Sequence, residues 1–477
     1  MTLEQGLVLA YLAGCIVIGI LASRRVIGSR EEYWVAGRNV GTLANAMAIM
    51  ATLASGGSII GVMGLAYSQG IPATLALFAG AVVGFPLASV LVARPLRNFG
   101  KYTITDFLAF RYPHAVMRFL VPVLIVVSFT AYIVAQMKAA GITANALLGI
   151  PYEVALTISA VVFILYVSVG GMVAVTWTDI FQGTLMLFVV LGTAFALIWR
   201  AGSPIDLMAE ATRAAPELGS LGNQPVAGYL GYFVIWATAI SIIPHIVMRV
   251  FTAKDAARAR LSLNLAMVVY SVMILAAALA IVPVGKVQFP ALADADQVFL
   301  KVMEVDFPPV VRGLAVAAVL AAVMSTTGAL LLACSSAVSH DLLEGFAGLE
   351  LSNKAMAWTQ VGTAWVIGGL ALYWAYSPPE LISEFYTAAI GWLSAALFVP
   401  TVGGLWWKKA NLAGGMAALL TGTAAYALIQ FGLIEVSLSP ILAALPASAL
   451  AMWLGGRLGR PETMDMMQHV ERLHQVG

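Results

Sequence analysis

Charged side chains are scarce in this chain: Asp, Glu, Lys and Arg together make up 10% of its 477 residues. Soluble domains carry about 25%. Hydrophobic residues make up 61% and the mean hydropathy is +0.93, so a soluble fold would lack the charge to cover its surface. The composition excludes a soluble globular protein and indicates an all-α integral membrane protein that crosses the bilayer many times.

Cysteine is nearly absent as well. Cys15 and Cys334 both lie in apolar segments, which argues against a disulfide framework. The five histidines are scattered along the chain, and no nucleophile–base pair or metal cluster is visible, so we expect no enzymatic activity. We also expect no nucleic-acid partner and no obligatory protein partner.

The start of the chain holds a motif that resembles a lipoprotein cleavage site, LAGC at Leu12–Cys15. A signal peptide carries its basic residues before the apolar stretch, whereas here Arg24 and Arg25 follow it. We therefore expect residues 5–23 to stay in the protein as a first membrane span.

Apolar runs of about 20 residues predict thirteen membrane spans. They lie at residues 5–23, 43–68, 72–93, 116–147, 152–170, 174–199, 226–248, 261–285, 309–337, 356–376, 381–406, 411–433 and 438–456. The polar segments 201–225 and 286–308 are long enough for short surface helices. No segment has the character of a soluble catalytic domain.

The basic residues are distributed unevenly over the two sides that thirteen spans define. One side holds 19 of the 25 Lys and Arg residues and the other side holds four. Because the cytoplasmic side carries the excess of basic residues, this bias predicts an outside N-terminus and a cytoplasmic C-terminus. We expect the protein to lie in a bacterial-type inner membrane.

The second predicted span has polar and flexible residues at its centre. It reads NAMAIMATLASGGSIIGVMGLAYSQG at 45–70, with Gly56 and Gly57 next to Ser55 and Ser58. Each glycine costs a helix about 1 kcal/mol, and an unwound backbone inside a membrane must be packed in protein or line a wet cavity. The segment predicts either a close contact between helices or a broken helix whose carbonyls bind an ion.

A second hydroxyl-rich segment, AAVMSTTGA at 321–329, lies in the middle of the span 309–337. Ala322 and Ser325 are three residues apart, so the Ala322 carbonyl and the Ser325 hydroxyl share a face. Sodium, like calcium, prefers several oxygen ligands. Two carbonyls from the broken helix, with one carbonyl and two hydroxyls from this segment, would form a five-oxygen sodium site.

One carboxylate, Asp179, lies in the first turns of the sixth span, within GGMVAVTWTDIFQG at 170–183. A charge at that depth needs water or a partner. Asp179 is therefore either an interfacial residue near the inner surface or a second cation site or proton relay.

Several stretches match a known family in the same order along the chain. They are RPLRNFGKYTITDFLAFRY at 94–112, AYIVAQMKAAG at 131–141, GGMVAVTWTDIFQG, IIPHIVMRVFTAKDA at 242–256, AAVMSTTGALLLACSSAVSHDL at 321–342 and GGLWWKKANLAGG at 403–415. The chain resembles the sodium/solute symporter family, which includes the proline, acetate and pantothenate permeases and the sodium–glucose cotransporters.

The resemblance implies a LeuT-like core of five plus five helices related by an inverted repeat. The repeats would occupy residues 43–199 and 226–406, with peripheral helices at 5–23 and 411–456. We find no internal symmetry in the sequence, and the span at 226–248 shows no Gly-Pro break to match Gly56 and Gly57.

The resemblance also assigns the sodium ligands, to the carbonyls of Ala51, Ala54 and Ala322 and the hydroxyls of Ser325 and Thr326. Family members with a further sodium use extra serines where this chain has Gly328 and Ala329. We therefore expect one sodium ion per cycle, with Asp179 tuning its site or passing a proton.

By the same resemblance, the residues that line the substrate site are Ser58, Tyr132, Gln136 and Trp236. Tyr132 and Trp236 could instead be ordinary packed aromatics, and Gln136 could bond another helix. Arg249, in PHIVMR, is expected to anchor the inner loop. Leu53 and Ile240 stand where the proline permeases carry an aspartate and a tyrosine, which argues against an amino acid.

The expected function is sodium-coupled import of a small organic anion, most simply a short monocarboxylate such as acetate, pyruvate or lactate. Pantothenate or another small solute with the same coupling is the alternative. Proton coupling through Asp179 and a role as a membrane sensor are alternatives of other classes.

Overall fold

The structure is a computed structural model that describes residues 2–23, 30–167 and 171–475, so Arg24 and Arg25 lie outside the described residues. Long apolar helices dominate that part of the chain. They are α1 (Leu3–Ser23), α5 (Ile71–Leu91), α8 (Ala115–Leu148), α9 (Tyr152–Val167), α10 (Gly171–Ala201), α12 (Val226–Ala239) with α13 (Pro244–Thr252), α14 (Ala256–Gln288), α16 (Pro309–Ser336) with its π-helical extension η6 (Ala337–Phe346), α17 (Asn353–Ala375), α18 (Ile382–Trp406), α19 (Leu412–Gln430) and α20 (Pro440–Leu458).

Shorter helices connect them or cover their ends. They are α2 (Arg30–Val35), α6 (Ala93–Phe99), α7 (Ile104–Arg111), α11 (Pro204–Ala214), α15 (Val298–Asp306), α21 (Met464–Arg472) and the 3₁₀ turns η1 (Ala36–Arg38), η3 (Pro216–Gly219), η4 (Leu221–Asn223) and η5 (Ala295–Gln297). The expected surface helices in 201–225 and 286–308 are therefore present, as α11 and α15.

The predicted spans agree with the helices of the described residues. Eleven helices are long and apolar enough to cross a membrane, and a bent pair formed by α3 (Thr42–Leu53) with η2 (Gly57–Gly61) and α4 (Val62–Gln69) makes a twelfth. The one remaining predicted span, 152–170, corresponds to α9, which is shorter, and residues 168–170 lie outside the described residues. The helix predicted to end at 337 continues through η6 to Phe346.

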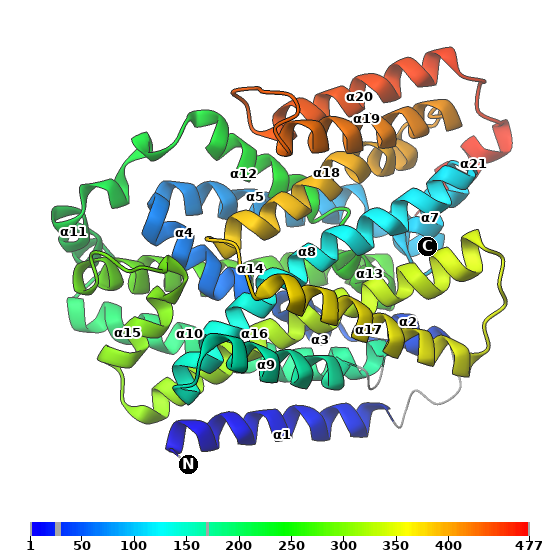
Figure 1. Cartoon of the computed structure of the whole chain (residues 1–477). Coiled ribbons are helices and arrows are strands. Elements are labelled where there is room, and N and C mark those ends of the chain that lie inside the picture. Colours follow the sequence, from blue (N-terminus) through cyan, green and yellow to red (C-terminus); the bar gives the residue numbers. More distant parts are fainter. Residues whose placement is uncertain (1, 24–29, 168–170, 476–477) are drawn as a thin grey trace.

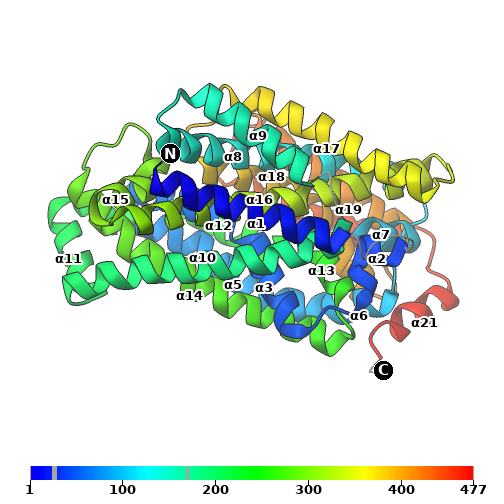
Figure 2. The same cartoon turned by 90° about the horizontal axis from the view of Figure 1, so that it is seen from below.

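Most helices run roughly parallel to one long direction of the molecule (Figure 1). The N-terminus lies at one end of this bundle and the C-terminus at the other, and the view from below agrees (Figure 2). Helices α11 and α15 lie at the N-terminal end, whereas α7, α13 and α21 lie at the opposite end. The loops predicted to be outside are therefore separated in space from the loops predicted to be inside.

Helices α3 and α16 lie within the bundle, while α1 and α20 lie on opposite sides of it (Figure 1). The span that contains α16 is almost completely buried, and α16 packs against α10, α8 and α3. The small residues of α16 let its neighbouring helices approach closely, as is common in helical membrane proteins.

The second span is broken, as one reading of its sequence predicts. Helix α3 ends at Leu53, Ala54 leaves the helical region (φ −71°, ψ 72°), and the chain resumes as the π-helical turn η2, with a bend of 59° between the two halves. Ser55 Oγ accepts the Ser58 backbone N–H at 3.1 Å, and Ser58 Oγ donates to Leu53 O at 2.9 Å. The two serines thus satisfy backbone groups that the break releases.

A second interruption lies in the span 226–248, where the sequence analysis found no Gly-Pro break and therefore did not expect one. Helix α12 ends at Ala239 and α13 begins at Pro244, and residues 240–243 between them belong to neither helix. Pro244 has no backbone N–H to donate and occupies the first position of the new helix, where that group would be unpaired anyway. The proline therefore marks this break, although no glycine accompanies it.

Candidate functional site

The broken end of α3 contacts the hydroxyl-rich centre of α16. Ser325 Oγ lies 2.8 Å from the Ala51 carbonyl oxygen and 3.1 Å from that of Ala322. Thr326 Oγ1 donates to the Thr52 carbonyl at 2.9 Å. All of these residues are buried. Two separate helices thus present a group of neutral oxygen atoms to one another in the interior of the bundle.

Four of the five predicted sodium ligands meet at this contact, namely Ala51, Ala322, Ser325 and Thr326. The fifth, Ala54, is the residue at which α3 stops being helical. The Thr52 carbonyl, which the sequence analysis did not consider, accepts the bond from Thr326. The only indication in the sequence that this carbonyl belongs to the contact is that Thr52 directly follows Ala51 in AIMATLA.

Asp179 lies beside this contact, but it has a charged partner. Its carboxylate forms an ion pair with Arg249 of α13, and both side chains are about 1% exposed. Thr52 Oγ1 lies 3.1 Å from the same carboxylate oxygen, and Arg249 Nη1 donates to Thr176 Oγ1 at 2.6 Å. The expectation that Arg249 anchors the inner loop is therefore wrong, because its guanidinium compensates a buried carboxylate within the bundle.

Thr52 connects the two features. Its carbonyl accepts the Thr326 hydroxyl of α16, and its own hydroxyl contacts Asp179 and the Ala48 carbonyl. A change in the charge or position of Asp179 can therefore reach the α3–α16 contact through a single residue.

Three of the four predicted substrate residues contact the unwound stretch. Gln136 Oε1 accepts the Gly56 backbone N–H at 3.0 Å, Tyr132 OH donates to Ser55 Oγ at 3.3 Å, and Ser58 Oγ lies 3.2 Å from Tyr270 OH. The structure brings together Ser58, Tyr132 and Gln136 at the break, as the resemblance implies.

Trp236 reaches the same region through another aromatic ring. Tyr386 stacks on Tyr132 with ring centroids 5.0 Å apart, and Trp236 meets the edge of Tyr386 at 5.8 Å. Trp236 Nε1 also donates to Thr387 Oγ1 at 3.3 Å. Sequence reasoning missed Tyr386 and Thr387, because α18 gives no local signal that its side chains face the break.

Glycine is required at the break because the neighbours are very close. A Cβ atom on Gly57 would lie 2.4 Å from Tyr386 Cε1, and one on Gly56 would lie 2.7 Å from Val323 Cγ2. The backbone of η2 is thereby pressed against α16 and α18, which places its amide and carbonyl groups next to the aromatic residues.

Several buried polar atoms around the break have no hydrogen-bond partner among the described residues. They are Gln136 Nε2, Ser383 Oγ and both ring nitrogens of His245, and Ser241 Oγ in the α12–α13 interruption is a further one. Buried polar groups are normally paired. The His245 ring lies 5.2 Å from Phe129 and 6.3 Å from Tyr132. A small polar solute next to η2 would satisfy such donors.

A second buried ion pair lies near the α4 half of the broken helix. Lys138 Nζ lies 2.7 Å from Asp296 Oδ2 and 2.7 Å from the Glu380 carbonyl, and Asp296 Oδ2 also accepts the Ile382 N–H at 3.1 Å. Burial raises the pKa of the Asp296 carboxyl to about 6, although Lys138 acts in the opposite direction. This pair joins α8, η5 and the start of α18.

Known proteins resemble the chain over nearly its whole length. It is 27% identical to the sodium/pantothenate symporter of Haemophilus influenzae over 90% of each protein. It is 28% identical to the sodium/proline symporter of Escherichia coli, over 86% of this chain and 84% of that one. In structure it resembles a Na⁺-coupled sialic acid symporter, with a TM-score of 0.80, 17% identity, and 97% and 99% of the two chains covered.

These relatives are transporters, and the shared fold is that of a multi-pass membrane carrier, as expected for a protein of the bacterial inner membrane. The broken helix, the facing hydroxyls of α16 and the paired Asp179 occur in a chain whose residues 33–422 match the sequence model of one family. The chain therefore belongs to the sodium:solute symporter family and couples transport to sodium.

Proposed function

We propose that this protein imports a small organic anion, most simply a short monocarboxylate, together with one sodium ion. The observation that carries the proposal is the contact of Ser325 and Thr326 with the carbonyls of Ala51 and Thr52. It offers a hard monovalent cation several neutral oxygens in a membrane interior. The family membership supplies the sodium coupling, and the solute is the part that remains a proposal.

The sodium ligands in this proposal are the carbonyls of Ala51, Ala54 and Ala322 and the hydroxyls of Ser325 and Thr326. The hydroxyls now donate to carbonyls of α3. A sodium ion would take those carbonyl oxygens and the hydroxyl oxygens as ligands, and would thereby hold α3 against α16. Asp179 acts as a positioning residue, since it reaches the ion only through Thr52.

Two features support an anion rather than an amino acid. Leu53 and Ile240 are apolar where an amino-acid carrier of the family would place an aspartate and a tyrosine. The unpartnered Gln136 Nε2 is a hydrogen-bond donor that a carboxylate could use. Tyr386 packs against Gly57 and is itself held between Tyr132 and Trp236, and this close packing favours a solute of a few carbon atoms.

Pantothenate is the second candidate, because a sodium/pantothenate symporter is among the most similar relatives. It is also a carboxylate, so it would use the same donors. Pantothenate is larger, however. Its binding would require the rings of Tyr132, Tyr386 and Trp236 to move further apart than the binding of a two- to four-carbon acid would require.

Transport would follow an alternating-access cycle. Sodium binds from the outside, orders the junction of α3 and α16 and completes the adjacent solute site at η2. The two interrupted spans, α3–α4 and α12–α13, are the elements that we assign to corresponding positions of two inverted repeats, 43–199 and 226–406. Release of sodium toward the cytoplasm then frees the solute.

The test is uptake into proteoliposomes under an imposed sodium gradient, with acetate, pyruvate, lactate, pantothenate and proline compared as solutes. Ser325→Ala and Thr326→Ala should each raise the half-saturating sodium concentration about tenfold, which corresponds to about 1.4 kcal/mol for one lost ligand. Ser335→Ala removes a buried hydroxyl of the same helix that has no hydrogen-bond partner in the described part of the chain, and it should leave the half-saturating sodium concentration unchanged.

The assignment of the sodium site and the assignment of the solute are tested by different results of this experiment. Unaltered sodium dependence in both Ser325→Ala and Thr326→Ala would mean that the ion binds elsewhere, whatever the solute. Sodium-driven uptake of proline in preference to every acid would overturn the solute assignment alone. Uptake that follows a proton gradient without sodium would favour coupling through Asp179.

A further inference from the structure

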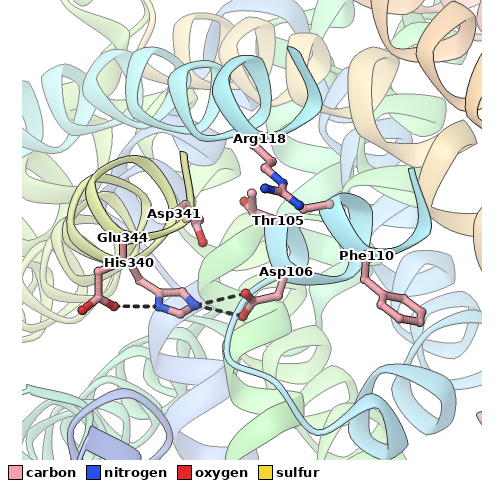
Figure 3. A pocket seen from close by; sticks show the side chains of 9 residues that line it. Thr105, Asp106, Phe110, Arg118, His340, Asp341 and Glu344 are labelled. Atoms are coloured by element: carbon pink, nitrogen blue, oxygen red, sulfur yellow. Dashed lines mark hydrogen bonds and ion pairs between the residues drawn. The ribbon is translucent and has the colours of Figure 1, made fainter. Parts of the chain in front are cut away.

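A separate cluster of metal-binding side chains lies at the end of the bundle that carries α7 and the C-terminus. A cavity of about 420 Å³ opens there between α7, the start of α8 and η6. Asp106 of α7 and His340, Asp341 and Glu344 of η6 line it together with Arg118 (Figure 3). The cluster is on different elements from the sodium and solute residues discussed above.

Three of these residues present ligand atoms to one another. One atom each from Asp106, His340 and Asp341 lies within 4.8 Å of the other two. His340 Nε2 is 3.0 and 3.1 Å from the two oxygens of the Asp106 carboxylate. Two ligands of a tetrahedral zinc ion are about 3.3 Å apart, so His340 and Asp106 need to shift by only a few tenths of an ångström to hold a metal between them. The ligand atom of Asp341, within 4.8 Å of the other two, would have to move closer, by up to about 1.5 Å.

Each of the three ligands is oriented by a second hydrogen bond. His340 Nδ1 lies 3.4 Å from Glu344 Oε2, so the other ring nitrogen faces the two aspartates. Thr103 Oγ1 donates to Asp341 Oδ1 at 3.0 Å. The backbone N–H groups of Tyr102 and Thr103 donate to Asp106. A carboxylate on the far nitrogen of a histidine, and hydrogen bonds to ligating carboxylates, are typical supports of protein metal sites.

Two further observations favour a cation. Thr105 Oγ1 lines the same cavity, is buried and faces the Asp341 carboxylate, but no acceptor among the described residues lies within ordinary hydrogen-bond distance of it. The lining also carries three carboxylates against the guanidinium of Arg118 and the imidazole of His340, which is paired with Asp106. A metal ion would displace the proton between His340 and Asp106, and the carboxylates would then balance the charge of the ion. His340 and Asp106 are each about one-fifth exposed, which leaves a path for the ion.

We propose that Asp106, His340 and Asp341 bind a divalent transition-metal ion of the zinc class, with water or the Thr105 hydroxyl as a fourth ligand. The imidazole nitrogen favours zinc over calcium or magnesium, which prefer oxygen ligands alone. The sequence analysis found no metal cluster because Asp106 and His340 are 234 positions apart. A bound ion would tie α7 to η6, the extension of the helix that carries Ser325 and Thr326.

The experiment uses the full-length protein, purified without a histidine tag and freed of metal, and titrated with Zn²⁺ by calorimetry and with Co²⁺ by visible absorption. The wild type should bind one equivalent of Zn²⁺ and give the intense absorption of four-coordinate Co²⁺. His340→Gln and Asp341→Asn should each abolish that equivalent. Glu344→Gln should bind at least about tenfold more weakly, since it removes only the support of the histidine.

His114→Asn is the matched control. His114 caps the start of α8 through an acceptor atom that asparagine also has, and it lies outside the proposed ligand set. This variant should bind zinc as the wild type does. Sodium-driven uptake and thermal unfolding without metal show whether each variant is folded, so loss of zinc binding in a folded His340→Gln protein supports the site.

Two results would overturn the proposal. The first is a wild-type protein that binds no stoichiometric Zn²⁺ and gives no Co²⁺ absorption. The second is a folded His340→Gln protein that retains the same equivalent with the same affinity, which would place the ion elsewhere. Neither result depends on whether the protein carries a monocarboxylate.

Discussion

Thr52 shows how one residue can serve two buried interactions. Its backbone carbonyl accepts the Thr326 hydroxyl and its side chain contacts Asp179. A threonine in a membrane helix usually bonds the carbonyl four residues earlier, and Thr52 does this as well. The further contact with Asp179 arises because α3 and α10 pack closely, which no local pattern in the sequence indicates.

The Asp179–Arg249 pair leads to a prediction about charge compensation. Asp179→Asn leaves the Arg249 guanidinium buried without a counter-charge, which typically costs about 3–5 kcal/mol. We expect a lower unfolding temperature and little uptake. The double variant Asp179→Asn with Arg249→Gln removes both charges and should recover most of the thermal stability. Thermal unfolding in detergent measures the stability of the single and the double variant. An equal loss of unfolding temperature in the two variants would argue against the pair.

Gly57 gives a steric prediction at the centre of the proposed solute site. In Gly57→Ala the new methyl group would lie 2.4 Å from Tyr386 Cε1, and that ring is held by its stack on Tyr132. Overpacking of this kind costs about 1–3 kcal/mol. We expect uptake at low solute concentration to fall about tenfold or more.

Gly192→Ala is the control for this substitution, because a Cβ at Gly192 meets nothing within 4 Å. It should transport as the wild type does. If Gly57→Ala transported equally well in the same assay, the packing of Tyr386 against η2 would have no role in solute binding.

At the scale of helices, the sequence predicted most of the fold because span length and hydropathy are local properties. It also indicated a break near Gly56 and Gly57 as one of two interpretations, since two adjacent glycines and flanking serines weaken a helix locally, and α3 ends just before them at Leu53. The break between α12 and α13 was missed because a single Pro244 is compatible with a continuous kinked span.

The candidate sites were predictable only in part. Ser325 and Ala51 could be paired through the family resemblance, whereas Asp179 with Arg249 and Asp106 with His340 could not. Each of those pairs joins side chains from distant segments. Which segments pack together depends on the whole bundle, and hydropathy does not encode it.

The Lys138–Asp296 pair, which joins α8, η5 and α18, predicts a pH dependence of stability. Asp296 has a pKa of about 6 in the folded protein against an ordinary value of 3.8. The folded state therefore holds an extra proton between these values, so this group makes the protein less stable as the pH rises from 3.8 to about 6.

Asp296→Asn should remove that slope from a plot of unfolding temperature against pH. Asp294→Asn should keep most of it, because burial raises the pKa of Asp296 more than the Asp294 charge does. Asp294 is a suitable control because it is a partly exposed carboxylate 3.5 Å from the same lysine. Identical slopes in the wild type and Asp296→Asn would contradict the elevated pKa.

At the scale of the whole molecule, the two ends of the bundle differ as the distribution of basic residues predicts. Segments that carry the excess of Lys and Arg, including α7, α13 and α21, lie at one end, and α11 and α15 lie at the other (Figure 1). Helices α3 and α16, which carry the proposed sodium ligands, lie between these ends (Figure 1). A carrier of this form can be driven by both components of the sodium gradient, or by one, depending on the charge of its solute.

That dependence yields a prediction about the driving force. One charge that crosses 100 mV gains about 2.3 kcal/mol, or about a fiftyfold accumulation. If one sodium ion enters with one monovalent anion, no net charge moves, so the membrane potential contributes nothing. We expect uptake into proteoliposomes to respond to the sodium concentration gradient and to be unaffected by potentials set with potassium and valinomycin.

A voltage-sensitive dye in the same vesicles provides the control, since it shows that the imposed potential is present while uptake stays constant. A current that scales with solute flux would mean that at least two sodium ions accompany the anion, or that the solute is neutral or zwitterionic. The absence of hydroxyls at Gly328 and Ala329 argues against a second ion bound there. An electrogenic cycle would therefore point first to the solute, and the acid panel would have to be extended to uncharged molecules.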